Sequence, residues 1–190
     1  PELRRLLGEE VENPVRAAAA YHLGSKTGDP EFFEKSIAFD PHGKYSRYAA
    51  FSKAQILLKS KDSKVRSKAV SDLLTIAFSK QNALSEDAFY LVAIESYNEE
   101  NYQMASNMLR NYLKKYPDGK YAAAANKMRL WALFLTGRYS DCILLTEGDG
   151  SEDALYISEM SHYQAGNVEK SQELFSRYLL SRIKYLQVST

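Results

Sequence analysis

The chain has few of the residues that interrupt regular secondary structure. Its 190 residues include only nine glycines and five prolines, together about 7% of the chain where about 12% is usual. Alanine, leucine, lysine and glutamate, which favour helices, are abundant. This composition predicts long helices with short connections, and it excludes a collagen, a low-complexity tail and a strand-rich sandwich.

Cysteine is nearly absent as well. Cys142 is the only one, so no disulfide can form within the chain. A small secreted scaffold held by disulfides is therefore excluded, while a reducing cytosol and an oxidising periplasm both remain. Ile143, Leu144 and Leu145 follow Cys142, which predicts a small buried apolar side chain at this position.

Excess charge and long apolar runs are also lacking. Lysine and arginine number 25 against 24 aspartates and glutamates, a net charge of +1, so the basic excess of a nucleic-acid-binding domain is missing. The longest apolar run, residues 130–135, is far shorter than the roughly 20 residues of a spanning helix. We therefore expect no nucleic acid partner and no transmembrane segment. Because the chain starts at Pro1 rather than Met, we expect a processed or excised fragment.

Helix start signals recur along the first half. Asn13-Pro14 and Asp29-Pro30 each read as an N-cap followed by proline in the first turn, and Asp62 is a further N-cap. Ser85, with two acidic residues after it, predicts another helix start. No alternation typical of a strand persists. The predicted helices before Ser85 cover residues 15–26, 30–39, 45–58 and 63–80.

A repeated pattern marks the second half. Three turn positions, 37 and 29 residues apart, each follow an aromatic residue by three places and precede a small residue by five. A small residue is needed where two antiparallel helices cross closely. The turn positions are Glu100, Gly137 and Gly166. The aromatic residues are Tyr97, Phe134 and Tyr163, and the small ones are Ala105, Cys142 and Ser171.

This pattern resembles the tetratricopeptide repeat (TPR), a helix–turn–helix unit of about 34 residues. The first half is closer to HEAT repeats, because Val15-Arg16-x-x-Ala19-x-x-x-Leu23 recurs 50 residues later, starting at Val65. The resemblances imply an all-α, right-handed α-solenoid of stacked antiparallel helix pairs with about eleven helices. HEAT-like repeats would cover residues 1–84 and TPR-like repeats residues 85–190, in one continuous solenoid.

No catalytic constellation is found in the sequence. The three histidines have no cysteine or histidine at metal-ligand spacing, and no HExxH, CxxC, GxSxG, Walker A or GxGxxG motif occurs. We therefore expect no catalytic residues, no metal and no cofactor within these residues.

The resemblance to TPR proteins also implies a binding groove. Counting the turn as position fifteen of the repeat, inner-face positions fall mostly on aromatic or aliphatic side chains, and the aromatic ones offer much contact area at low entropic cost. The alternative is that Trp131, Phe134 and Leu135 pack on a neighbouring helix. The basic residues from Lys53 to Lys80 form either a solvated face or a site for an anionic partner. The candidate groove residues are Tyr90, Tyr97, Asn98, Lys127, Trp131, Tyr156, Tyr163 and Gln164.

The expected function is a non-catalytic scaffold that binds a peptide segment or a partner protein. The segment 112–121, with Tyr116-Pro117 and Tyr121, is similar to a connector in TPR proteins of the bacterial envelope. This likeness implies a periplasmic or envelope-associated location, with peripheral envelope association as one form of it. The alternatives are the superhelical domain of a larger periplasmic enzyme, such as a lytic murein transglycosylase, and a cytosolic adaptor in the cytoplasm.

Overall fold

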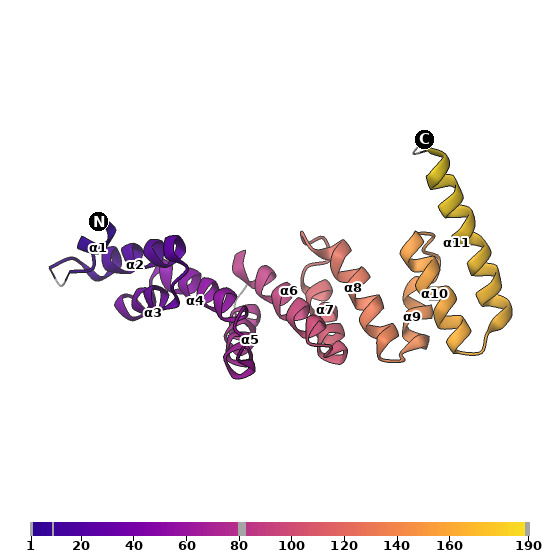
Figure 1. The fold of residues 1–190 in the computed structure, drawn as a ribbon, viewed down its shortest axis with the longest axis horizontal. Helices are drawn as coiled ribbons and strands as arrows, with labels where there is room; N and C mark the ends of the chain where they lie inside the picture. Colours follow the sequence, from indigo (N-terminus) through magenta and orange to yellow (C-terminus); the bar gives the residue numbers. More distant parts are fainter. Residues whose placement is uncertain (1, 9, 80–82, 189–190) are drawn as a thin grey trace. The chain divides into compact units, whose positions relative to one another are not determined.

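The computed structural model describes residues 2–8, 10–79 and 83–188, and these contain 11 helices and no strand (Figure 1). Neighbouring helices pack in succession. The predicted all-α class is therefore confirmed, and the arrangement is consistent with a helical solenoid. The chain divides into two compact units, Pro1–Glu95 and Ser96–Thr190. The division falls inside one helix, α6, and each unit is described by itself. The change of repeat type at residue 85 stays a prediction.

Unit 1 begins its helices largely where the sequence predicts. Asp29 accepts a hydrogen bond from the Glu31 N–H at 3.0 Å, and Asp62 accepts one from the Lys64 N–H at 2.8 Å. Both side chains therefore satisfy N–H groups of a first helical turn, as N-caps do. Asn13 is not an N-cap but the first helical residue. The helices are α1 (Glu2–Arg5), α2 (Asn13–Thr27), α3 (Pro30–Phe39), α4 (Lys44–Leu57), α5 (Ser63–Phe78) and α6 (Ala83–Asn98), of which unit 1 holds the part up to Glu95.

The helices of unit 1 pack closely through small residues. Gly24 on α2 faces the buried ring of Phe33 on α3, and a Cβ atom at Gly24 would lie 2.9 Å from that ring. The buried Ser36 hydroxyl donates to the Ala17 carbonyl oxygen at 2.8 Å, which joins the same two helices. Alanines and Leu73 fill most of the remaining core.

The predicted helix start at Ser85 is wrong. Ser85 lies inside α6 and is fully buried. Its hydroxyl donates to the Ile76 carbonyl oxygen of α5 at 3.1 Å. A serine before acidic residues has the local signature of an N-cap, but here the hydroxyl makes a contact with another helix instead. The predicted end of the preceding helix, Lys80, lies outside the described residues.

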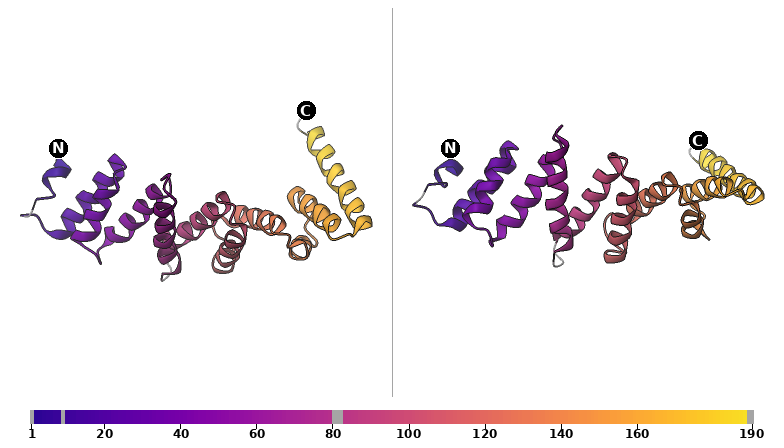
Figure 2. Two further views of the ribbon diagram at one scale, coloured as in Figure 1. Left: turned by 60° about the horizontal axis from the view of Figure 1, so that its bottom comes forward. Right: turned by 90° about the horizontal axis from the view of Figure 1, so that it is seen from below.

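Unit 2 continues the succession with antiparallel neighbours. Its helices after α6 are α7 (Tyr102–Lys115), α8 (Ala122–Leu135), α9 (Tyr139–Thr146), α10 (Glu152–Gln164) and α11 (Val168–Val188). The most extensive packing joins α10 to α11 and α7 to α8. Both views in Figure 2 show α10 and α11 side by side. Tyr112 of α7 is fully buried, and its hydroxyl oxygen accepts a hydrogen bond from the Tyr121 N–H at 3.0 Å.

The three predicted turn positions of unit 2 share one backbone geometry. Glu100, Gly137 and Gly166 all have positive φ angles, of 59°, 71° and 81°. The residue that follows each turn position donates its N–H to the carbonyl oxygen five residues before itself, at 2.8, 2.9 and 2.8 Å. This hydrogen-bond pattern is that of a Schellman motif at a helix end. The small residues five positions after each turn are all buried, as predicted. The structure therefore confirms the helix–turn–helix register.

Candidate functional site

Three rings from three helices form an aromatic row in unit 2. The ring centroid of Trp131 on α8 lies 5.9 Å from that of Tyr156 on α10, and Tyr156 lies 5.5 Å from Tyr178 on α11. All three side chains are half-buried. Trp131 and Tyr156 also pack against a core cluster of Leu133, Cys142 and Ile157. The core cluster thus holds Trp131 and Tyr156 in place, while the rings of the aromatic row remain partly exposed to solvent. A contact surface for an apolar side chain needs both properties.

An ion pair lies on the same two helices as the first rings. Lys127, one helical turn before Trp131, has its Nζ atom 2.8 Å from Oδ2 of Asp153, one turn before Tyr156. Both side chains are about half exposed, at 57% and 47%, so the pair adds little stability. Each charge remains accessible to a ligand. The structure therefore brings together Lys127, Trp131 and Tyr156 from the predicted groove.

Tyr97 and Tyr163 occupy equivalent positions at two turns but differ in their surroundings. The Tyr97 ring packs edge-on against Tyr102 at 5.1 Å, and burial together with Tyr102 raises the pKa of the Tyr97 hydroxyl. Phe134 makes the same contact with Tyr139 at 5.4 Å. Tyr163 has Val168 in place of that second ring and is 59% exposed. Of these three turn aromatics, Tyr163 is therefore the one most available to a partner.

The remaining predicted groove residues are dispersed. Asn98 and Gln164 are exposed at the ends of α6 and α10. Tyr90 is half-buried on the part of α6 that belongs to unit 1. Lys127, Trp131 and Tyr156 are thus the part of the predicted set that the structure brings together within one unit.

Cys142 lies in the core of unit 2. Cys142 is fully buried, as predicted, and burial raises the pKa of its thiol. A protonated, inaccessible thiol is a poor nucleophile. Among the described residues, no cluster of three or more histidine, cysteine, aspartate or glutamate side chains could hold a metal ion. None of the described helices is both long enough and apolar enough to cross a membrane.

The basic stretch in unit 1 is partly neutralised. Lys53 lies 2.8 Å from Glu34, and this hydrogen bond lowers the pKa of the Glu34 carboxyl. Arg66 donates to the Ser60 carbonyl oxygen at 3.0 Å and lies 3.6 Å from Glu95. These contacts favour a structural role for Lys53 and Arg66 within the unit.

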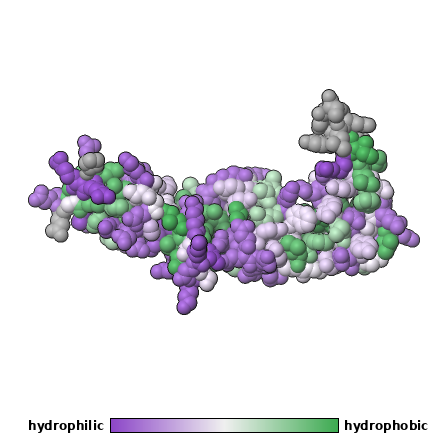
Figure 3. Space-filling view, in the orientation of Figure 1, coloured by the Kyte–Doolittle hydropathy of each residue, from purple (hydrophilic) through white to green (hydrophobic). Residues whose placement is uncertain are grey.

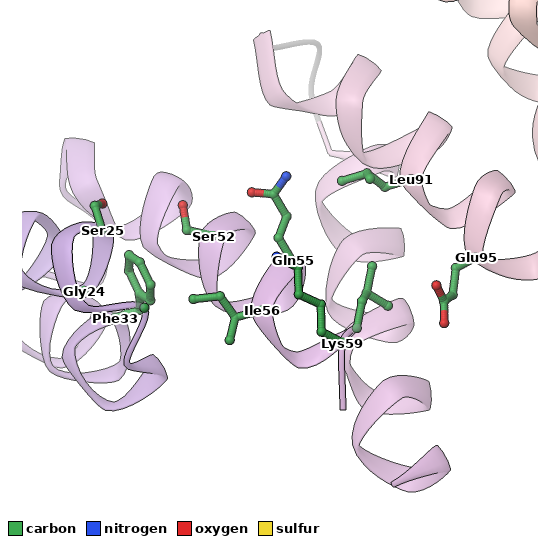
Figure 4. A pocket seen from close by; sticks show the side chains of 11 residues that line it. Gly24, Ser25, Phe33, Ser52, Gln55, Ile56, Lys59, Leu91 and Glu95 are labelled. Carbon is green, nitrogen blue, oxygen red and sulfur yellow. The ribbon is translucent and has the colours of Figure 1, made fainter. Parts of the chain in front are cut away.

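Unit 1 also contains an open pocket of about 620 Å³. Figure 4 shows Gly24 and Phe33 on one side of this pocket and Glu95 on the other, with α4 residues between them. Lys59 and Glu95 are its charged side chains. No predicted groove residue lines it.

A second groove, of about 640 Å³, lies between α9, α10 and α11 in unit 2. Its apolar lining includes Leu144, which is 68% exposed, and its charged lining residues are Glu147, Asp149, Lys170 and Arg177. Sequence analysis missed this groove, because its residues fall outside the inner-face positions of the repeat. Leu144 lies four residues before the turn Gly148-Asp149-Gly150. Nothing in the sequence distinguishes this exposed leucine from a leucine of the core.

Comparisons with known proteins do not place the chain in a family. No protein-family model matches it, and no curated protein matches it either.

Proposed function

We propose that this chain is a TPR-like scaffold that binds a peptide segment of a partner protein on the aromatic row of α8, α10 and α11. The observation that carries the proposal is the contact of Tyr156 with both Trp131 and Tyr178, three half-buried rings from the helices α8, α10 and α11. Rings held in place before binding lose little entropy when they receive a ligand. The pair Lys127–Asp153 beside them offers one charge of each sign to orient a peptide.

The repeat register supports the finer assignment to TPR-like units. The same Schellman hydrogen bond recurs after Glu100, Gly137 and Gly166, and each turn is followed by a buried small residue. The HEAT-like assignment of residues 1–84 is part of the same proposal. We further propose an envelope-associated, bacterial setting, supported by the similarity of the 112–121 segment to envelope TPR proteins.

Trp131 makes the proposal directly testable because it is the only tryptophan. Peptides selected from a random display library on the purified chain are titrated while Trp131 fluorescence is followed. We expect saturable changes in emission and enrichment of apolar residues among the selected peptides. Tyr156→Ala should weaken binding by about 2 kcal/mol, or roughly 30-fold, as expected for a buried interface aromatic.

The control is a tyrosine in the other unit. Tyr48 on α4 is 39% exposed and lies in unit 1. Tyr48→Ala should leave peptide affinity unchanged. If the Tyr156→Ala protein keeps its helix content and binds the selected peptides as tightly as the original chain, the aromatic row is not the binding site.

A further inference from the structure

Three arginines from neighbouring helices form a group in unit 2, which we call the arginine cluster. Arg110 belongs to α7, Arg129 belongs to α8, and Arg138 immediately precedes α9. Arg129 and Trp131 are two residues apart on α8, so their side chains leave the helix in directions about 200° apart. Arg129 therefore lies on the side of α8 away from the aromatic row.

Arg129 occupies a position that the repeat otherwise gives to a buried small or apolar residue. The residues eight places before the three turn positions are Val92, Arg129 and Ser158. Val92 and Ser158 are buried, at 0% and 7% exposed. On α8 itself, Ala125 and Ala132 lie one turn to either side of Arg129 and are fully buried. A charged side chain thus leaves the packed face of α8, where arginine is rare unless it is paired.

The guanidinium group of Arg129 has no partner within the described part of the chain. Its Nε atom is buried and makes no hydrogen bond. Burial, then Arg110 and Arg138, lower the pKa of Arg129 below its ordinary value. Asp141 acts in the opposite direction, but Oδ2 of its carboxylate accepts a hydrogen bond from Arg138 at 2.6 Å. An unpaired, partly buried charge is costly, and a bound anion would offset this cost.

Helix packing brings the three arginines to one place. α8 packs against both α7 and α9. Arg110 lies five residues from the end of α7 and Arg129 seven residues from the start of α8, so in this antiparallel pair their levels differ by about 3 Å. The Cys142 thiol of α9 donates to the carbonyl oxygen of Leu130, the neighbour of Arg129, at 3.6 Å. Arg138 lies one helical turn before Cys142.

The charge around the cluster favours a ligand with two negative charges. Figure 3 shows hydrophilic side chains in purple over α7, in contrast to the green apolar side chains along α11. Because Asp141 neutralises Arg138, the positive charges of Arg110 and Arg129 remain. A phosphate monoester carries about two negative charges and three strong acceptor oxygens, and the planar fork of arginine matches phosphate geometry. α7 and α8 contain no acidic residue, and their basic residues are Arg110, Lys114, Lys115, Lys127 and Arg129.

We propose that the arginine cluster binds a dianionic phosphate group between Arg110 and Arg129, with Arg138 at its edge. Arg138 donates to Asp141 through Nε, so its two terminal nitrogens are the ones that face a ligand. Because Arg129 and Trp131 point to different sides of α8, this site is separate from the aromatic row and does not rest on peptide binding there.

Isothermal titration calorimetry with inorganic phosphate tests the site, at constant ionic strength and at about pH 8, where phosphate is mainly dianionic. We expect one phosphate per chain. Arg129→Met removes the charge but keeps an unbranched side chain, so it should weaken binding at least tenfold without lowering the melting temperature. Arg110→Met, at an exposed position, should weaken binding to a similar extent. Arg177→Met is the matched control, because Arg177 is an exposed arginine of α11 in the same unit, and it should not alter the affinity.

Two results would overturn the proposal. One is a chain that binds phosphate no better than chloride at the same ionic strength. The other is an unchanged phosphate affinity in both Arg129→Met and Arg110→Met.

Two further ligands test the charge and the source of the phosphate group. Dimethyl phosphate has a single negative charge and should bind at least tenfold more weakly than inorganic phosphate, and equal affinity would contradict recognition of a dianion. Phosphoserine presents the same dianionic group as a monoester. Tighter binding of phosphoserine identifies an esterified phosphate as the ligand, and tighter binding of inorganic phosphate identifies the free ion, so either result supports the site.

Discussion

Replacing Glu100 with glycine should stabilise the protein. Glu100 has a φ angle of 59°, in the left-handed region, and is the only described non-glycine residue with a positive φ. That conformation costs an ordinary residue about 1–2 kcal/mol, whereas glycine adopts it freely. Glycine also makes the unfolded chain more flexible, which costs about 0.4–1 kcal/mol of stability. The conformational gain exceeds this loss, so Glu100→Gly should raise the free energy of unfolding by about 0.5–1 kcal/mol.

The neighbouring glutamate provides the matched control. Glu99 has no positive φ angle, so Glu99→Gly gains nothing from the turn and should lower stability by about 0.5–1 kcal/mol. Glu100→Gln removes the same charge without the added backbone freedom and should have little effect. Urea denaturation followed by Trp131 fluorescence measures all three variants. If both glycine substitutions destabilise the protein equally, the Glu100 turn does not have the geometry of the Gly137 and Gly166 turns.

Three further predictions concern packing and pH. Ala105→Leu overfills a fully buried helix crossing and should lower stability by about 1–3 kcal/mol; an unchanged melting temperature would contradict the repeat register. Tyr112→Phe removes a buried hydroxyl that accepts a hydrogen bond from Tyr121 and should cost about 1–2 kcal/mol in urea denaturation. Burial and Lys170 lower the pKa of His162 from its ordinary 6.5. Below about pH 6.5 the unfolded chain binds a proton at His162 more readily than the folded chain does, so the free energy of unfolding should fall as the pH decreases. His162→Gln should flatten this dependence in melting curves between pH 7 and about pH 5.

Local chemistry made much of the fold predictable. The N-caps Asp29 and Asp62 act within one helical turn, and the register of Glu100, Gly137 and Gly166 follows from residues at fixed distances along the chain. Such signals need no knowledge of distant residues. Ser85 was misinterpreted because the Ile76 carbonyl that its hydroxyl reaches belongs to another helix.

The candidate site was predictable only in part. Repeat phase placed Lys127, Trp131 and Tyr156 on one face, and the structure brings the three together. Tyr178 was not among the predicted groove residues, although its half-buried ring extends the row. The 48% exposure of Phe175 on α11 could not be foreseen, because an amphipathic helix has the same sequence pattern whether or not a neighbour covers its apolar side.

The packing of each helix mainly on its neighbours along the chain has a consequence for how unit 2 folds. The helix contacts described there join elements that are adjacent or one helix apart in the sequence. Short sequence separations make loop closure cheap, so we expect folding on a microsecond to millisecond timescale. A pair such as α10 and α11 can then open without unfolding α7 and α8, and amide exchange in unit 2 would follow a gradient along the chain rather than one cooperative event.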